Sequence, residues 1–135
     1  MNENFSITKH FSYRECFPNS NREPRLIRNA VVTCCFLEVL RSVLGNRPLY
    51  VNSFYRDKEY NSSLSKSVPN SLHISSLACD FSLREYGSIL PEDFDSIFNI
   101  ARDIFSENFA IFGSYSLSYY FITSFDVHIQ LKPVS

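Results

Sequence analysis

Two segments of the chain alternate strictly between apolar and polar side chains, and this alternation constrains the fold more than any other feature. In the first, Leu77–Leu83, the odd positions carry apolar or thiol side chains, and Asp80 lies on the opposite face among small residues. In the second, Phe125–Leu131, positions 127, 129 and 131 are apolar, and Asp126 and His128 face the other way. A period of two is typical of strands with one face against a core. We therefore expect two strands of a half-buried sheet.

Apolar residues at helical spacing predict two principal helices. The first runs from about Pro24 to Leu44, with Pro24 suited to the first turn and Gly45 supplying the stop. The second spans about Pro91–Phe105, with the carboxylate of Glu92 in a first turn that the helix dipole favours. We interpret both apolar stripes as core rather than as cofactor-binding surface.

Three further segments rich in β-formers complete the predicted sheet, and the polar stretch 57–70 is interpreted as a surface loop. The three expected strands are Pro48–Tyr55, Phe109–Phe112 and Tyr119–Ile122. A length of 135 residues is enough for one compact domain and too little for two. The order of elements predicts an α+β fold, a small single domain over residues 1–135 with a mainly antiparallel sheet and two principal helices.

Composition excludes several classes of function. The formal net charge of −1 gives no electrostatic case for binding nucleic acid or an anionic membrane. Hydrophobic residues make up 44% of the chain, which argues against disorder. No apolar run approaches 18 residues, so we expect no membrane span. The start of the chain lacks a basic region followed by an apolar stretch, so we expect no secretory signal.

The four cysteines do not form a Cys-x-x-Cys motif, so a thiolate zinc site is poorly supported. Cys34 and Cys35 are neighbours on a predicted helix and point in different directions, which argues against a bond between them. We interpret Cys34, Cys35 and Cys79 as small buried hydrophobes, and free thiols fit synthesis in a reducing compartment. His10 is interpreted as a surface residue without a role.

The candidate metal ligands are His73, Asp80 and His128. Two imidazoles and one carboxylate are a ligand set of catalytic zinc sites, which keep a fourth position open for water. Asp80 and His128 each lie on the polar face of a predicted strand, and His73 precedes the first strand in a loop. If the two strands lie near each other in one sheet, the three side chains converge. The sequence therefore predicts a Zn²⁺ site with the equipment for amide hydrolysis.

Two more residues are candidates for the chemistry. A hydrolase needs a base for the water proton, and Asp126 lies two residues before His128, on the same face. The alternatives are that Asp126 is an ordinary solvated carboxylate or the partner of a ligand histidine. Arg56 ends the strand Pro48–Tyr55, and its guanidinium could hold a substrate carbonyl or carboxylate near the metal. Its alternative is a surface ion pair.

This ordered set of residues resembles the zinc D-alanyl-D-alanine carboxypeptidase family, which includes bacteriophage peptidoglycan endopeptidases and belongs to the hedgehog/D-Ala-D-Ala peptidase fold group. The similarity runs from about Phe11 to Leu131. The run Ser53–Arg56 matches the family's Ser-Gly-Tyr/Phe-Arg motif apart from Phe54. The run Ser71–Asp80 matches Ser-x-His-x-x-Gly-x-Ala-x-Asp, with Ser76 where glycine is usual.

The resemblance implies that His73, Asp80 and His128 bind Zn²⁺ and that Arg56 and Ser71 contact the substrate. It implies a metallopeptidase, of D,D-carboxypeptidase or endopeptidase type, that cleaves peptidoglycan stem or cross-link peptides during phage lysis or entry. Such a protein would be a monomer made in the bacterial cytoplasm without a signal peptide, and it would act on the cell wall if phage-encoded.

Many members of that family place the catalytic acid three residues before the last histidine, where this chain has Phe125. Either Asp126 serves in its place, or the base comes from elsewhere. The same departure motivates an alternative from another class, a catalytically silent zinc-binding module that recognises wall peptides or a protein partner. A structural phage or bacterial protein without a metal is the third interpretation.

Overall fold

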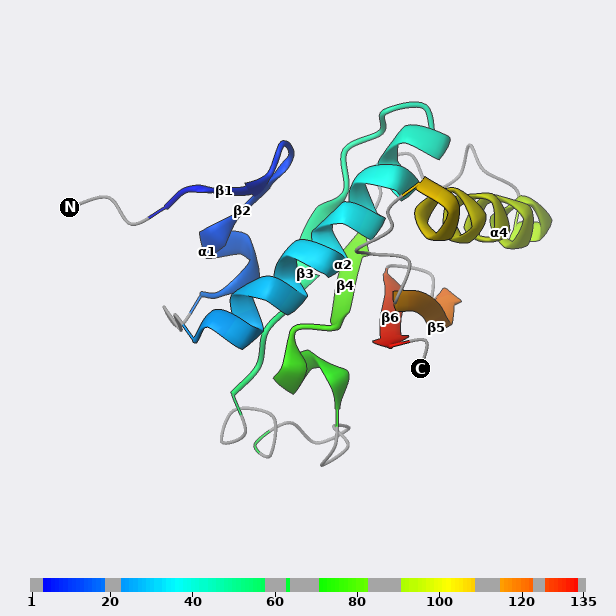
Figure 1. The fold of residues 1–135 in the computed structure, drawn as a ribbon. Helices are drawn as coiled ribbons and strands as arrows, with labels where there is room; N and C mark the ends of the chain where they lie inside the picture. Colours follow the sequence, from blue (N-terminus) through cyan, green and yellow to red (C-terminus); the bar gives the residue numbers. More distant parts are fainter. Residues whose placement is uncertain are drawn as a thin grey trace.

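An antiparallel sheet with helices packed on one face organises the part of the chain that the computed structural model describes (Figure 1). The described residues are 4–18, 23–57, 63, 71–82, 91–108, 115–122 and 126–133. The strands follow the spatial order β3-β4-β6-β5. Their bounds are β3 Tyr50–Ser53, β4 Ala78–Ser82, β5 Tyr115–Ile122 and β6 Val127–Pro133. The predicted α+β class with an antiparallel sheet is confirmed.

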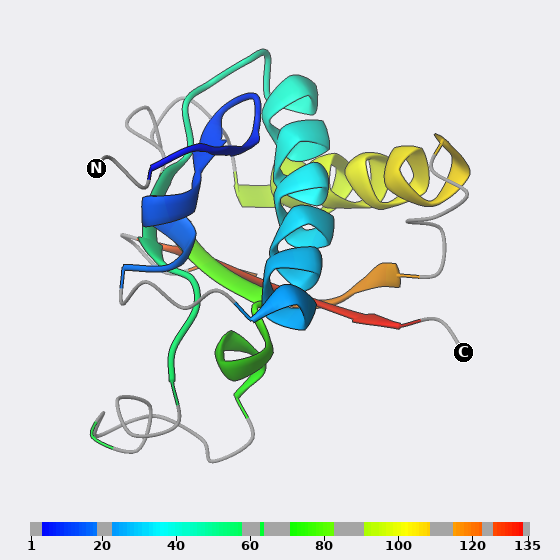
Figure 2. The same cartoon turned by 60° about the vertical axis from the view of Figure 1, so that its left-hand side comes forward.

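Both principal helices were predicted correctly, to within a few residues. Helix α2 spans Pro24–Val43, with Pro24 in the first turn as expected, and Gly45 beyond its end has a φ of +77°. Helix α4 spans Pro91–Asn108. Figure 2 shows the two axes crossing steeply above the sheet. Phe36 of α2 meets Phe105 of α4 edge to face, with ring centroids 5.6 Å apart.

The predicted alternation is confirmed in the two central strands. In β4, Cys79 and Phe81 are fully buried while Asp80 is partly exposed. In β6 the apolar residues at 127, 129 and 131 are fully buried and alternate with the partly exposed His128 and Gln130. The apolar faces of both strands join the core beneath the helices, so the opposite face carries the polar side chains.

Regular structure also occurs in the N-terminal stretch, where the sequence shows no clear period. Strands β1 (Ser6–Thr8) and β2 (Phe11–Ser12) pair, and the short helix α1 (Tyr13–Cys16) follows. Ser12 and Glu15 form a capping box, in which each side chain accepts a hydrogen bond from the other residue's backbone N–H. Local capping rather than periodicity therefore forms this region.

Other predicted boundaries moved. β3 is shorter than the expected Pro48–Tyr55, and β5 begins at Tyr115 rather than Tyr119. A 3₁₀ helix, η1 (Leu72–Ser75), carries His73 where a loop was expected. The expected strand Phe109–Phe112 lies outside the described residues, as does nearly all of the expected loop 57–70. No helix in the described ranges is both long and apolar enough to cross a membrane.

Candidate metal centre

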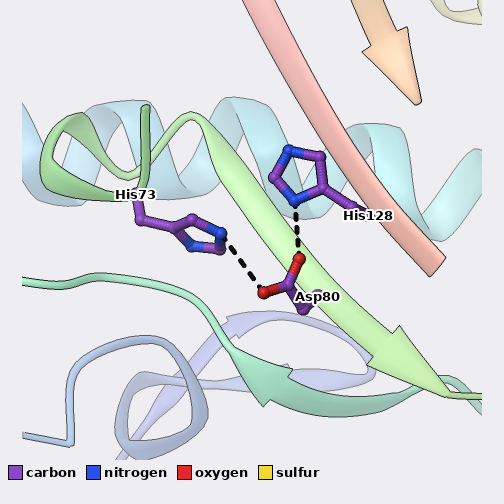
Figure 3. A group of neighbouring side chains, drawn as sticks. All are labelled: His73, Asp80 and His128. Atoms are coloured by element: carbon purple, nitrogen blue, oxygen red, sulfur yellow. Dashed lines mark hydrogen bonds and ion pairs between the residues drawn. The ribbon is translucent and has the colours of Figure 1, made fainter. Parts of the chain in front are cut away.

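Strand register brings two of the candidate ligands together. Asp80 in β4 is directly opposite His128 in β6, and opposed residues of an antiparallel pair point to the same face. Nδ1 of His128 lies 2.6 Å from Oδ1 of Asp80. From η1, Nε2 of His73 comes within 3.4 Å of Oδ2 of Asp80 (Figure 3). The candidate ligand atoms of these residues all lie within 4.8 Å of one another, so the group could hold a metal ion, and the predicted convergence is confirmed.

His73 is held from several sides. Its backbone N–H donates to Oγ of Ser71, which caps η1, and its carbonyl accepts from the backbone N–H of Arg56 at 3.0 Å. Its ring Nδ1–H donates to the carbonyl of Phe54 at 2.7 Å, and the side chain is buried. The other ring nitrogen, Nε2, faces Asp80. This arrangement is typical of a metal-ligating histidine oriented by a backbone carbonyl.

The His128 ring also contacts a residue that was not among the candidates predicted from the sequence. Its Nδ1–H donates to the Asp80 carboxylate, and its Nε2 lies 2.8 Å from Oε1 of Gln130. Phe121 of β5, opposite His128 in the register, stacks on the imidazole with ring centroids 5.0 Å apart. The alternation in β6 already placed Gln130 on the face of His128, and this was the signal that could have identified it.

Helix α2 supports the turn that carries His73. The Asn29 amide donates to the carbonyl of Ser75 at 3.0 Å, and the Thr33 hydroxyl donates to that of Ser76 at 2.7 Å. Both donors are buried. They satisfy carbonyls at the end of η1, which a helix end otherwise leaves without partners. The sequence predicted only apolar core residues along the buried face of α2, so the roles of Asn29 and Thr33 were not predicted. The two residues are four apart, which places them on the same face of the helix.

Ser76 takes a left-handed conformation, with φ of +61°, immediately after η1. This is the position at which the resembled family has glycine. A side chain in this region costs about 1 kcal/mol. Its buried Oγ also has no hydrogen-bond partner among the described residues. The turn that carries His73 is therefore locally strained.

The electrostatics of the group favour a cation at its centre. Burial opposes ionisation of Asp80, but hydrogen bonds with His128 and then His73 outweigh it and hold the pKa of Asp80 far below its usual range. Burial lowers the pKa of His128, but its hydrogen bond to Asp80 outweighs that effect, so the pKa is raised overall. The Asp80 carboxylate therefore stays ionised and favours positive charge between it and the two imidazoles. A divalent cation supplies that charge by displacing protons.

Arg56 lies beside this group, as the sequence predicted. Its Nη2 is 3.4 Å from Oδ2 of Asp80, and its Nε–H donates to Oγ of Ser53. The guanidinium side chain is only 16% exposed, so this is a partly buried ion pair with a candidate ligand and not one on the open surface.

Asp126 is not among the gathered ligand atoms. Its Oδ1 accepts a hydrogen bond from the Asn52 amide. Asn52 belongs to β3 and Asp126 precedes β6, and these strands flank β4 on either side. The hydrogen bond therefore spans β4, the strand that carries Asp80, and holds the Asp126 carboxylate.

Comparisons with known proteins return no significant match: no protein-family model matches the chain, and neither does any curated protein or solved structure. The resemblance noted from the sequence therefore depends on its motif residues alone.

Proposed function

We propose that this chain is a zinc-dependent peptidase that hydrolyses a peptide bond in peptidoglycan stem or cross-link peptides. The observation that carries the proposal is the convergence of His73 Nε2, His128 Nδ1 and the Asp80 carboxylate within 4.8 Å. Three nitrogen and oxygen ligands leave a fourth position open, as in catalytic and not structural zinc sites. The motif order around Ser53–Arg56 and Ser71–Asp80 supports the hedgehog/D-Ala-D-Ala peptidase fold group and the cell-wall substrate.

The residues around the centre suit such a reaction. When bound, zinc supplies a Lewis acid for the substrate carbonyl and lowers the pKa of a water. Arg56 brings a positive charge to the same edge of the site, where it stabilises negative charge that develops on the carbonyl oxygen. Asp126 takes the proton from water and returns it to the leaving amine, with Asn52 holding one of its oxygens. Ser71 contributes a hydroxyl next to His73.

Two measurements test the proposal. Purified protein is first analysed for metal content after loading with zinc or with ferrous iron, which two imidazoles and one carboxylate can also bind. We expect about one zinc per chain. The loaded protein is then incubated with purified peptidoglycan, and we expect new amino termini or released D-alanine. Zinc-loaded protein that binds intact peptidoglycan without releasing either product would overturn the peptidase assignment.

One observation favours a second candidate, the catalytically silent zinc-binding module. The carboxylate proposed as base is engaged by Asn52 and lies outside the gathered ligand atoms. Substituting Asp126→Asn separates the two functions. A peptidase loses cleavage and retains zinc. A silent module shows no cleavage in either version, and its binding to wall peptides is unchanged by the substitution.

A further inference from the structure

Two cysteines far apart in the sequence meet on the opposite side of the sheet from the metal centre's polar face. Cys16 ends α1 and Cys34 lies in the middle of α2. Their Sγ atoms are 3.6 Å apart, and neither residue has any exposed surface. All four cysteines of the chain are free thiols in this structure. The contact joins the N-terminal layer to the principal helix.

We propose that Cys16 and Cys34 are a disulfide modification site, and that the folded chain accepts a bond between them when a disulfide oxidant such as oxidised glutathione is present. A disulfide requires an S–S distance near 2.05 Å, so the two sulfurs must approach by about 1.5 Å. The two side chains are already in contact through their sulfurs. The inference does not depend on the proposed peptidase function.

The chemistry balances without any other reactant. One thiol, as its thiolate, attacks oxidised glutathione and releases one reduced glutathione. The second thiolate then displaces the other glutathione from the mixed disulfide. The protein loses two protons and two electrons, and one glutathione disulfide becomes two thiols.

The contact between the two sulfurs distinguishes this pair among the chain's thiols. Cys35 is the neighbour of Cys34 on α2 and is half buried, so it faces another direction. Cys79, buried in β4, lies near the pair and is the competing partner that the test must distinguish. Burial raises the pKa of the Cys34 thiol and that of Cys79, so both stay protonated and unreactive until the region opens. Helix α1 has only four residues, and opening of this short layer gives the oxidant access.

The bond would fix the layer that supports the metal centre. The carbonyl of Cys16 accepts a hydrogen bond from the backbone N–H of Tyr55 at 3.0 Å. The neighbours of Tyr55 are Phe54, whose carbonyl holds the ring of His73, and Arg56, whose N–H holds its backbone. A covalent link from α1 to α2 therefore anchors the segment from which His73 is oriented.

The test uses the full-length protein in glutathione redox buffers. After equilibration, free thiols are alkylated, and intact mass and peptide mapping locate any bond. We expect a single Cys16–Cys34 disulfide, two alkylated thiols, and a Tm raised by about 10 °C that returns to its starting value with a reductant. Cys34→Ala should abolish both changes, and Cys35→Ala should leave both intact.

Four alkylated thiols at every redox ratio would overturn the proposal, as would a bond that uses Cys35 or Cys79 or stable mixed disulfides with glutathione. A Cys16–Cys34 bond that lowers Tm would also overturn it, because the native geometry would then not accept the link. If Cys34→Ala fails to fold, peptide mapping of the unmodified sequence still decides between these outcomes.

Discussion

Two carboxylates in the described part of the chain, Glu38 and Asp80, each have a histidine nitrogen 2.6 Å away, and the two sites differ in what else surrounds the carboxylate. In the pairs His10–Glu38 and His128–Asp80, the imidazole Nδ1 lies 2.6 Å from a carboxylate oxygen. The second group at Asp80 is another imidazole, that of His73, at 3.4 Å. The second group at Glu38 is the backbone N–H of His10, at 2.7 Å. The first arrangement brings two imidazoles to one carboxylate, whereas in the second His10 contacts the carboxylate through both its ring and its backbone.

The two pairs also differ in exposure. The His10 side chain is 34% exposed and that of His128 is 13% exposed. Burial opposes ionisation of Glu38, but hydrogen bonds from His10 outweigh it and lower its pKa. The pKa of Asp80 lies far below its usual range for a similar reason, with hydrogen bonds to two imidazoles instead of one. Glu38 on α2 therefore binds His10 in the β1–β2 turn and connects these two elements, whereas Asp80 belongs to a candidate metal centre. A pairwise distance alone would not separate them.

The largest expected effect separates the two histidines directly. His128→Gln removes a candidate ligand and should weaken zinc affinity by more than about 100-fold, since even loss of a residue behind a ligand costs 10–100-fold. His10→Gln should leave zinc affinity unchanged. Competition with a chromophoric chelator measures both. Equal affinities for the two variants would remove the distinction between the two pairs.

The next effect tests whether α2 positions His73. Thr33→Val keeps the shape of the side chain but leaves the Ser76 carbonyl without its donor. We expect a loss of about 2 kcal/mol in the free energy of unfolding and zinc affinity about 10-fold weaker. Denaturant titration of the metal-free protein and chelator competition measure these quantities.

Glu38→Gln is the matched control for Thr33→Val, because it also lies on α2 and weakens a contact outside the metal centre. Its zinc affinity should equal that of the unmodified protein despite its lower stability. If both variants lose affinity in proportion to stability, then Thr33 acts only through the fold.

A smaller effect depends on pH. The folded-state pKa of Glu38 is lowered, so its contribution to stability is present above its ordinary value of 4.5 and is lost as the pH falls through the folded-state value. At neutral pH we expect Glu38→Gln to cost about 1 kcal/mol. The cost should vanish in acid below the lowered pKa. Urea titrations of both proteins across this range measure it, and a cost that grows on acidification would contradict the assignment.

The smallest effect concerns strain at the metal-centre turn. Ser76→Gly removes a side chain from a left-handed backbone and a buried hydroxyl without a described partner. The relief of about 1 kcal/mol is partly offset by the greater freedom of glycine in the unfolded chain. We expect a net stabilisation of about 0.5 kcal/mol in denaturant titration. A destabilised variant would show that the Ser76 side chain contributes contacts that outweigh the strain.

The sequence predicted the convergence of the candidate metal ligands but not the residues that support them. Alternation in β4 and β6 identified the face that carries Asp80 and His128, because the direction of a side chain in a strand is a local property. The hydrogen bonds from Asn29 and Thr33 could not be predicted, because the sequence around a polar helix residue does not indicate which distant carbonyl will accept its hydrogen bond. The α1 region escaped because capping and packing, rather than a period, form it.

The roles of Arg56, Ser71 and Asp126 remain predictions, although each now has a described partner: Asp80, the backbone of His73 and Asn52, respectively. Arg56 was expected near the centre because it ends a strand, and β3 does run beside β4. The sequence predicts a loop around His73 and no helix η1, so it does not predict that Ser71 caps the start of that helix.

By itself, the sequence determined the α+β class, the two long helices and the faces on which the acid and the last histidine lie. Periodicity records which side of an element is buried, and burial is set by hydrophobicity along a short stretch of chain. Only the tertiary structure decided that Asp80 opposes His128, that the ring nitrogens of both imidazoles turn toward one carboxylate, and that Cys16 meets Cys34. Those outcomes depend on strand register and on contacts between residues far apart in the chain, which no local pattern encodes.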